Sequence, residues 1–190
     1  MVMSLVHGVG VNDIAYPVTY AKGDKRVEHH WYSEWRCMIR RCYGIDAKPS
    51  YSGVVVCQDW LSLSLFKVWY DKELCDYLFD KSLLQLDKDL LDKSAKLYSP
   101  ETCCFLPKSL NKALVGLSCS ELVRKRGVKY EAYIKRFGKY KHLGTFSNKG
   151  YAQDLAIKEK IKYIKEIIIK EEGITPLPTR LKLKEITYEQ

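Results

Sequence analysis

Residues 127–170 carry the pattern that most restricts how this chain can fold. Polar and apolar residues alternate over residues 127–134, which is the period of a strand with one buried face. A turn at Gly138-Lys139 and a returning strand over residues 140–146 complete a predicted hairpin. The residues expected on its apolar face are Val128, Tyr130, Ala132 and Ile134.

A long amphipathic helix is predicted directly after the hairpin, over residues 150–170. Gly173, Pro176 and Pro178 end it. Its apolar stripe consists of Ala152, Leu155, Ala156, Ile161, Ile164, Ile167 and Ile168. A single helix covers one face of a small antiparallel sheet, so the other face is expected to be free.

The preceding body is predicted to mix helices with short strands. Apolar residues recur with helical spacing from Trp31 to Cys42, and Gly44 ends this first helix. Further expected elements are a strand at 54–56, a helix at 60–70, a strand or strand and turn at 83–90, and an amphipathic segment at 106–117. We therefore expect an α+β chain. Its expected parts are an N-terminal segment (1–30), the body (31–117), a basic sheet-plus-helix domain (118–172) and a C-terminal tail (173–190).

The positive charge of the chain is concentrated in residues 122–170. This segment holds 14 Lys and Arg against 4 Asp and Glu, whereas the rest of the chain holds 18 against 19. A uniformly basic, tail-like protein is therefore excluded, and 46% hydrophobic residues are enough to bury a core. A near-neutral body with one basic module is typical of proteins that meet phosphates or anionic surfaces.

Composition also indicates a reducing compartment, and we expect a cytoplasmic protein. No apolar run approaches the roughly 18 residues of a membrane span, and residues 1–11 lack the features of a signal peptide. The cysteines are odd in number and lack Cys-x-x-Cys spacing, which favours buried, reduced thiols over the alternative of a zinc site. They are Cys37, Cys42, Cys57, Cys75, Cys103, Cys104 and Cys119.

The second face of the predicted hairpin alternates cations with an aromatic residue. We expect this face to hold Lys129, Tyr133 and Lys135, followed around the turn by Lys139 and Lys141. A two-stranded ribbon fits the major groove of B-DNA, where Lys and Arg reach guanine edges or phosphates. Cations just upstream are expected to clamp the DNA backbone, namely Arg124, Lys125 and Arg126. The helix lysines are expected to be solvated, namely Lys158, Lys160, Lys162 and Lys165.

The basic segment contains the string KYEAYIKRFGKYKHLGTFSNKGYA, followed by a long helix. This combination resembles the DNA-binding domain of plant ethylene-response factors, which also occurs in phage-encoded homing endonucleases. The match includes Leu143-Gly144-Thr145-Phe146 and Ala152 and covers about residues 120–170. The resemblance implies a three-stranded antiparallel sheet that packs on one long helix and enters the major groove. It implies duplex DNA binding by Lys129, Tyr133, Lys135, Arg136, Lys139 and Lys141, and we add His142 of the same hairpin as a candidate contact.

The body contains, in order, WRCMIRRCY from Trp35, YSGVVVCQDW from Tyr51, LDKDLL from Leu86, YSPETC from Tyr98, and Leu110-Asn111. This order resembles phage HNH-like endonucleases over about residues 31–112. The resemblance implies a ββα finger, in which two strands and a helix hold one divalent metal for DNA hydrolysis. The side chains of such a body that bind DNA phosphates would be chiefly those of Arg36, Arg40 and Arg41.

Carried over residue by residue, the resemblance implies an altered finger. Asp87 takes the position of the metal-binding Asp, and Lys88 stands where the general-base His would be. Thr102 takes the position of the middle Asn of the finger, and Asn111 takes the position of the metal ligand on the helix. A protonated lysine is a poor base at neutral pH, so the finger is expected to be degenerate.

A Mg²⁺ site is nevertheless a candidate at these positions. Asp87 and Asp89, two residues apart on a strand, would share one face and offer oxygen ligands together with Asn111. An ordinary surface Asp-Lys-Asp turn is the alternative interpretation. A replacement base would have to come from one of four histidines, none of which has an obvious acidic partner in the sequence. They are His7, His29, His30 and His142.

Three functions remain open from the sequence. The first is a phage-type protein that binds double-stranded DNA and acts by occupying it. The second is an active divalent-metal-dependent endonuclease, a hydrolase of the HNH type. The third is a protein-interaction or inhibitor module that presents its basic face to an acidic partner.

Overall fold

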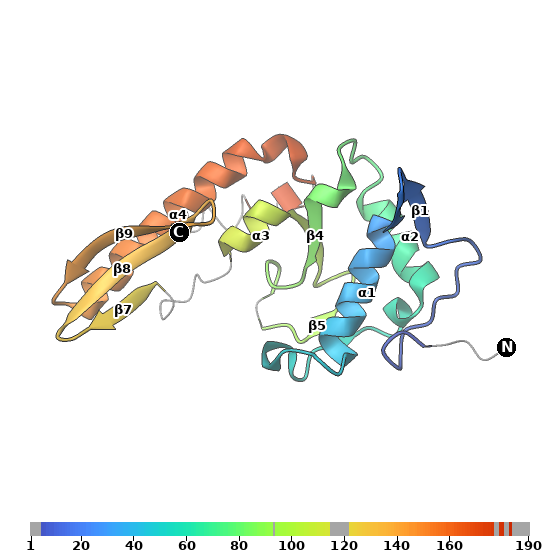
Figure 1. The fold of residues 1–190 in the computed structure, drawn as a ribbon, viewed down its shortest axis with the longest axis horizontal. Coiled ribbons are helices and arrows are strands. Elements are labelled where there is room, and N and C mark those ends of the chain that lie inside the picture. Colours follow the sequence, from blue (N-terminus) through green and yellow to red (C-terminus); the bar gives the residue numbers. More distant parts are fainter. Residues whose placement is uncertain (1–4, 93, 115–121, 177–178, 181–182, 184–190) are drawn as a thin grey trace. The chain divides into compact units, whose positions relative to one another are not determined.

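The computed structural model describes residues 5–92, 94–114, 122–176, 179–180 and 183 (Figure 1). The chain divides into two compact units, residues 1–106 with 176–182, and residues 107–175 with 183–190. Both units combine helices with small sheets, so the predicted α+β class is confirmed. Within the described residues, no helix combines the length and apolar character that crossing a membrane requires.

Two helices dominate the first unit. Helix α1 (His30–Tyr43) matches the predicted first helix, and the backbone N–H of Gly44 closes it by donating to the Arg40 carbonyl at 2.9 Å. Helix α2 (Leu63–Glu73) begins three residues later than the predicted start of the second helix. Its N-cap is Ser62, whose hydroxyl accepts the Leu65 N–H at 3.3 Å.

Large aromatic side chains form the core of this unit. Trp35, Trp60, Phe66 and Phe105 are almost fully buried in one cluster. The indole N–H of Trp35 donates to the Trp60 carbonyl at 2.7 Å, so its one polar group is satisfied inside the core. Each large apolar side chain buried in this way stabilises the fold by about 1.5–3 kcal/mol.

Short strand pairs surround these helices. Strands β1 (Thr19–Lys22) and β2 (Lys25–Glu28) form an antiparallel hairpin that the sequence patterns did not predict. The expected strand at 54–56 is β3 (Val55–Val56), which pairs in parallel with β5 (Leu97–Tyr98). Strand β4 (Leu84–Asp87) pairs with β6 (Cys104–Pro107). Single 3-10 turns lie at Pro49–Tyr51, Asp59–Leu61, Lys81–Leu83 and Glu172–Ile174.

The second unit begins with helix α3 (Lys108–Leu114), which follows β6 directly. It then forms a three-stranded antiparallel sheet in the order β7 (Val123–Arg126), β8 (Lys129–Arg136) and β9 (Lys139–Phe146). Helix α4 (Lys149–Lys170) covers one face of this sheet (Figure 1). The core between them is formed by Leu122, Ala132, Ile134, Ala152 and Ala156. The predicted sheet packed on one long helix is thus confirmed.

Three details of this unit differ from the sequence expectation. Val128 is 87% exposed, because it lies with Gly127 in the turn between β7 and β8 and not on the apolar face. The tip of the β8-β9 hairpin is Phe137-Gly138 and not Gly138-Lys139. Lys160 is only 4% exposed, so the prediction that all four helix lysines are solvated is wrong at this position.

The six cysteines within the described part of the chain are free thiols. Cys103 and Cys104 are buried, and burial raises the pKa of Cys103 to about 12. Burial also raises the pKa of Cys42 to about 11. Such thiols are protonated and unreactive at neutral pH, in keeping with the predicted structural role. Cys119 lies outside the described residues.

Candidate nucleic-acid interface

The strand register of the β7-β8-β9 sheet separates its side chains into two faces. Residues directly opposite one another in an antiparallel pair share a face, and neighbours along a strand alternate. Ala132 and Ile134 pack toward α4, so the residues between them and their partners point away from the helix. We name this side the exposed sheet face. Its members are Arg124, Arg126, Lys129, Glu131, Tyr133, Lys135, Tyr140, His142 and Thr145.

Two tyrosines form the centre of the exposed sheet face. The rings of Tyr133 and Tyr140 meet edge to face, with their centroids 5.6 Å apart. The guanidinium carbon of Arg124 lies 5.4 Å from the Tyr133 centroid, and the Lys135 ammonium lies 5.6 Å from the Tyr140 centroid. The two rings therefore position two cations on a surface that takes no part in the core. Tyr140 was not among the contacts predicted from the sequence, and the structure shows it 70% exposed on this face.

The exposed sheet face carries an excess of positive charge. Within the described part of the chain, Arg126 is the one cation of this face that is neutralised, by an ion pair in which its Nε lies 3.1 Å from Oε2 of Glu131. Arg124, Lys129 and Lys135 form no ion pair with any described residue. His142 adds a ring whose Nε2 lies 3.4 Å from the Thr145 hydroxyl. Cations that the protein itself does not neutralise are available to phosphates.

Four other predicted DNA contacts lie on the opposite face. Arg136 forms an ion pair with Glu166 of α4, and Lys141 Nζ lies 3.6 Å from Glu159 Oε2 of the same helix. Lys125 and Lys139 share this face by register. The expectation that Lys139 and Lys141 lie on the free face is therefore wrong. The two-residue turn pairs Lys139 with Arg136, and alternation then carries Lys141 to the helix side.

A β-bulge in β9 decides which of its side chains lie on the exposed sheet face. The register shifts between Ala132 and Tyr133, which lie opposite Gly144 and His142, so that Leu143 is the extra residue. Leu143 packs against the core, while His142 points away from it. The predicted contact at His142 is thereby kept on the exposed sheet face.

The three arginines of α1 are engaged by groups of the first unit. Arg36 Nη2 lies 3.1 Å from Glu28 Oε2, and Arg40 pairs with Asp46. Arg41 is half-buried and hydrogen-bonded to the Tyr98 hydroxyl. Phosphate binding by these three residues stays a prediction. A phosphate would have to compete with the partners that they already have.

The chain turns immediately after Asp87, at the position of the expected catalytic finger. Asp87 Oδ1 accepts the backbone N–H groups of Asp89 at 3.0 Å and Leu90 at 2.8 Å. The Lys88 ammonium lies 2.5 Å from Asp89 Oδ1 and donates to the Ala95 carbonyl at 3.1 Å. Because β4 ends at Asp87, the expectation that Asp87 and Asp89 share one face of a strand is wrong.

The surroundings of Asp87 raise the pKa of its carboxyl group. Burial raises the pKa of its carboxyl above the ordinary 3.8, and the nearby charge of Asp89 raises it too. The N–H donors of Leu90 and Asp89 and the charge of Lys88 oppose this rise without cancelling it. The ionised carboxylate therefore lowers the stability of the folded state, although backbone hydrogen bonds hold it in place.

Groups of the protein itself engage one oxygen of Asp87 and one of Asp89, and Mg²⁺ binding by these residues stays a prediction. Two backbone donors engage Oδ1 of Asp87, and the Lys88 ammonium lies 2.5 Å from Oδ1 of Asp89. Among the described residues, no three or more His, Cys, Asp or Glu side chains gather as metal ligands do. Asn111 lies on α3, in the other unit.

Thr102, the candidate for the middle finger position, organises a turn. Its hydroxyl donates to the Leu97 carbonyl at 2.7 Å, and its oxygen accepts the Ser99 N–H at 3.1 Å. These bonds close the segment between β5 and β6. A role in orienting a base stays a prediction.

A buried network around His30 was missed by sequence reasoning. His30 Nε2 lies 3.6 Å from Glu34 Oε1, and Nδ1 lies 2.9 Å from the Tyr70 hydroxyl. Glu34 also accepts the backbone N–H of Leu86 at 3.0 Å. No histidine has an obvious acidic partner in the sequence, but the structure places Glu34 beside His30. The spacing of four residues on one helix was the available signal.

Comparisons with known proteins returned no matching family model, no matching curated protein and no matching solved structure. The function proposed below therefore rests on the geometry of the exposed sheet face.

Proposed function

We propose that this chain binds double-stranded DNA through the exposed sheet face and acts by occupying the DNA. The observation that carries the proposal is a set of three cations on this face that form no ion pair with any described residue. Arg124 and Lys135 lie over the rings of the Tyr133–Tyr140 pair, and Lys129 lies farther along β8 on the same face. A sheet with one face on a helix and one face open is a shape that enters the major groove. The tyrosine edges and hydroxyls would contact bases while the cations contact phosphates.

The charge on the other side of the unit supports the same assignment. Arg136 and Lys141 form ion pairs with glutamates of α4, whereas among the described residues Arg126 is the one cation of the exposed sheet face that has an acidic partner. Cations without an acidic partner raise the positive potential that attracts DNA phosphates.

Fluorescence anisotropy with a labelled duplex of about 20 base pairs tests the proposal, since this length spans about two turns of DNA. The variant Arg124→Ala/Lys129→Ala/Lys135→Ala should lower the salt slope of the binding constant by about 0.9 for each lost phosphate contact. The matched control is Lys158→Ala/Lys162→Ala/Lys165→Ala, which removes the same charge from exposed positions of α4. Equal weakening by both variants would show that net charge alone drives binding and would refute the proposed face.

An active endonuclease is the second candidate function. The succession of β4, β6 and α3 favours it, because two paired strands followed by a helix is the order of a ββα finger. The ion pair between Lys88 and Asp89 and the bonds at Asp87 argue for occupancy without cleavage. Supercoiled plasmid incubated with the protein and Mg²⁺ or Mn²⁺ is expected to stay intact. Nicking that disappears in Asp87→Ala would establish the endonuclease instead.

The third candidate function, a protein-interaction or inhibitor module, is tested with the same purified protein. A stable complex with an acidic protein, combined with no retention of duplex DNA at low salt, would replace the DNA-binding proposal.

A further inference from the structure

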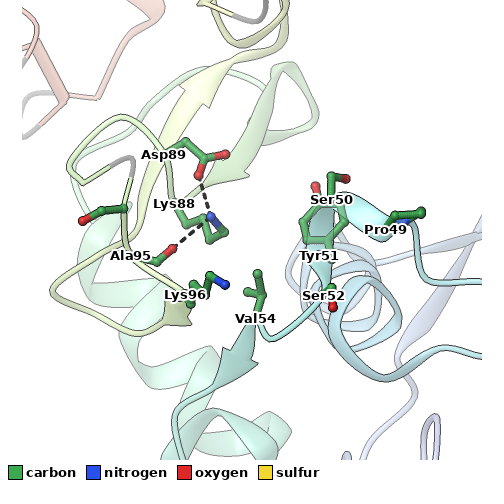
Figure 2. A pocket seen from close by; sticks show the side chains of 10 residues that line it. Pro49, Ser50, Tyr51, Ser52, Val54, Lys88, Asp89, Ala95 and Lys96 are labelled. Atoms are coloured by element: carbon green, nitrogen blue, oxygen red, sulfur yellow. Dashed lines mark hydrogen bonds and ion pairs between the residues drawn. The ribbon is translucent and has the colours of Figure 1, made fainter.

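A hollow of about 540 Å³ lies in the first unit, between the segment that contains the Pro49–Tyr51 turn and the segment that follows β4. Its volume is within the range of small-molecule sites, about 300–1,000 Å³. Figure 2 shows the Lys88 and Lys96 side chains extending from one wall and Ser50, Tyr51 and Ser52 on the other. We name this hollow the two-lysine cavity.

Hydrogen bonds hold the Lys88 ammonium in place at the edge of the cavity. Lys88 is only 8% exposed, and two of its three N–H donors are directed to Asp89 and to the Ala95 carbonyl. No described residue takes the third donor. A buried ammonium with one unused donor at the edge of a cavity is a preorganised partner for an anion.

Lys96 brings a second ammonium without an ion pair among the described residues. Lys96 lies beside Gly53, where an added Cβ would be in ordinary contact with Lys96 Nζ at 3.7 Å, and the φ of +73° at this position is one that residues other than glycine rarely adopt. The cavity therefore holds two ammonium groups against one carboxylate, that of Asp89. This excess of charge selects an anion over a cation.

The remaining lining indicates what the anion is attached to. Ser50 and Ser52 add hydroxyl groups, while the ring of Tyr51 and the side chain of Val54 add apolar surface beside them. Such a mixture suits a small organic molecule that carries a phosphate. Because Lys88 is nine-tenths buried, a terminal phosphate reaches it more easily than a phosphodiester flanked on both sides by nucleotides.

We propose that the two-lysine cavity binds a phosphate monoester, with Lys88 and Lys96 holding the phosphate and Tyr51 contacting the organic group. The class that fits is a nucleoside monophosphate or a molecule of similar size. This site is separate from the exposed sheet face and does not depend on the proposed DNA binding.

Isothermal titration calorimetry on the full chain tests the site with three probes, inorganic phosphate, adenosine monophosphate and adenosine. Adenosine monophosphate is expected to bind most tightly, inorganic phosphate more weakly, and adenosine not at all. Adenosine binding as tight as that of its monophosphate would overturn the proposal. So would binding of a 5′-phosphorylated duplex at this site with no binding of the mononucleotide.

Two variants give opposite expected effects. Lys96→Gln should weaken the binding of adenosine monophosphate about tenfold, which corresponds to the loss of one charge-assisted hydrogen bond. Asp89→Asn should strengthen the binding, because the substitution removes the carboxylate that competes with the phosphate for Lys88. The matched control is Lys48→Gln, an exposed lysine beside the Pro49–Tyr51 turn that does not line the cavity. Equal loss in Lys48→Gln and Lys96→Gln, or no gain in Asp89→Asn, would show that no specific site exists.

Discussion

The guanidinium of Arg124 lies over the ring of Tyr133, 5.4 Å from its centroid, although the two residues belong to neighbouring strands. Lys135 and Tyr140 repeat this relation at 5.6 Å across β8 and β9. An aromatic ring under each cation limits its rotamers and keeps it on the exposed sheet face. The cations therefore reach a ligand with less entropy to lose than free surface lysines.

Tyr140 and Lys135 are expected to affect DNA binding in different ways. Tyr140→Ala should weaken binding by about 1 kcal/mol and leave its salt slope unchanged, because the side chain carries no charge. Lys135→Ala should lower the slope by about one. Anisotropy titrations at four or more salt concentrations measure both quantities. A slope change in Tyr140→Ala equal to that in Lys135→Ala would contradict the separate roles assigned to them.

The elements with long apolar periods were predictable from the sequence. Helices α1 and α4 bury a full stripe, so their period of 3.6 residues is visible without any knowledge of partners. The β1-β2 hairpin was not, because its strands have four residues each and are mostly exposed. Its only local signal was the Gly23-Asp24 turn. Burial of Lys160 was also unpredictable, since a lysine within a helix pattern is normally solvated.

The candidate interface was predictable in composition but not in geometry. The sequence shows which strands are basic, and the period of two assigns Lys129, Tyr133 and Lys135 to one face. It does not show the bulge at Leu143 or the start of the turn at Phe137, and a shift of one residue exchanges the faces. Partners such as Glu159 for Lys141 come from another element, so they appear only in three dimensions.

Gly144 is expected to be intolerant of a side chain. Its φ is +141°, and a Cβ there would lie 2.6 Å from Cζ of Phe146. Gly144→Ala should therefore destabilise the second unit by about 1–3 kcal/mol. Far-UV circular dichroism in urea measures this loss. All four tryptophans lie in the first unit, so the midpoint of tryptophan fluorescence should stay unchanged as the internal control.

Tyr163 is expected to hold the tip of the β8-β9 hairpin on α4. Its hydroxyl accepts the backbone N–H of Phe137 at 2.9 Å, and the two rings meet edge to face at 5.2 Å. Phe137 has a φ of +46°, which is strained for this residue, so the contact keeps an unfavourable conformation in place. Tyr163→Phe should cost about 1 kcal/mol in thermal or urea unfolding. Tyr151→Phe, at an exposed ring of the same helix, is the control and should cost almost nothing.

Asp13 is expected to stabilise the first unit at neutral pH and not at acid pH. Burial alone would raise its pKa, but hydrogen bonds from Ser62 and Ser64 outweigh burial and lower the pKa below its ordinary 3.8. A carboxylate with a lowered pKa contributes stability above 3.8 and loses it as the pH falls through the folded-state value. Asp13→Asn should thus be less stable than wild type at pH 7. The difference in free energy of unfolding should shrink below pH 4 (about the ordinary carboxyl pKa), and a constant difference would contradict the assignment.

Asp87 is expected to show the opposite dependence on pH. Its pKa is raised by burial and by Asp89, so the folded state holds the proton more tightly than the unfolded state. The ionised form therefore costs stability, and this cost is absent below 3.8 and grows as the pH rises through the raised folded-state pKa. Asp87→Asn keeps an oxygen that can accept the Asp89 and Leu90 N–H groups and removes the charge. Its stability relative to wild type should therefore increase from acid to neutral pH. Urea unfolding followed by tryptophan fluorescence at several pH values measures this trend, and a relative loss of stability toward neutral pH would mean that the carboxylate is stabilised by a partner absent from this structure.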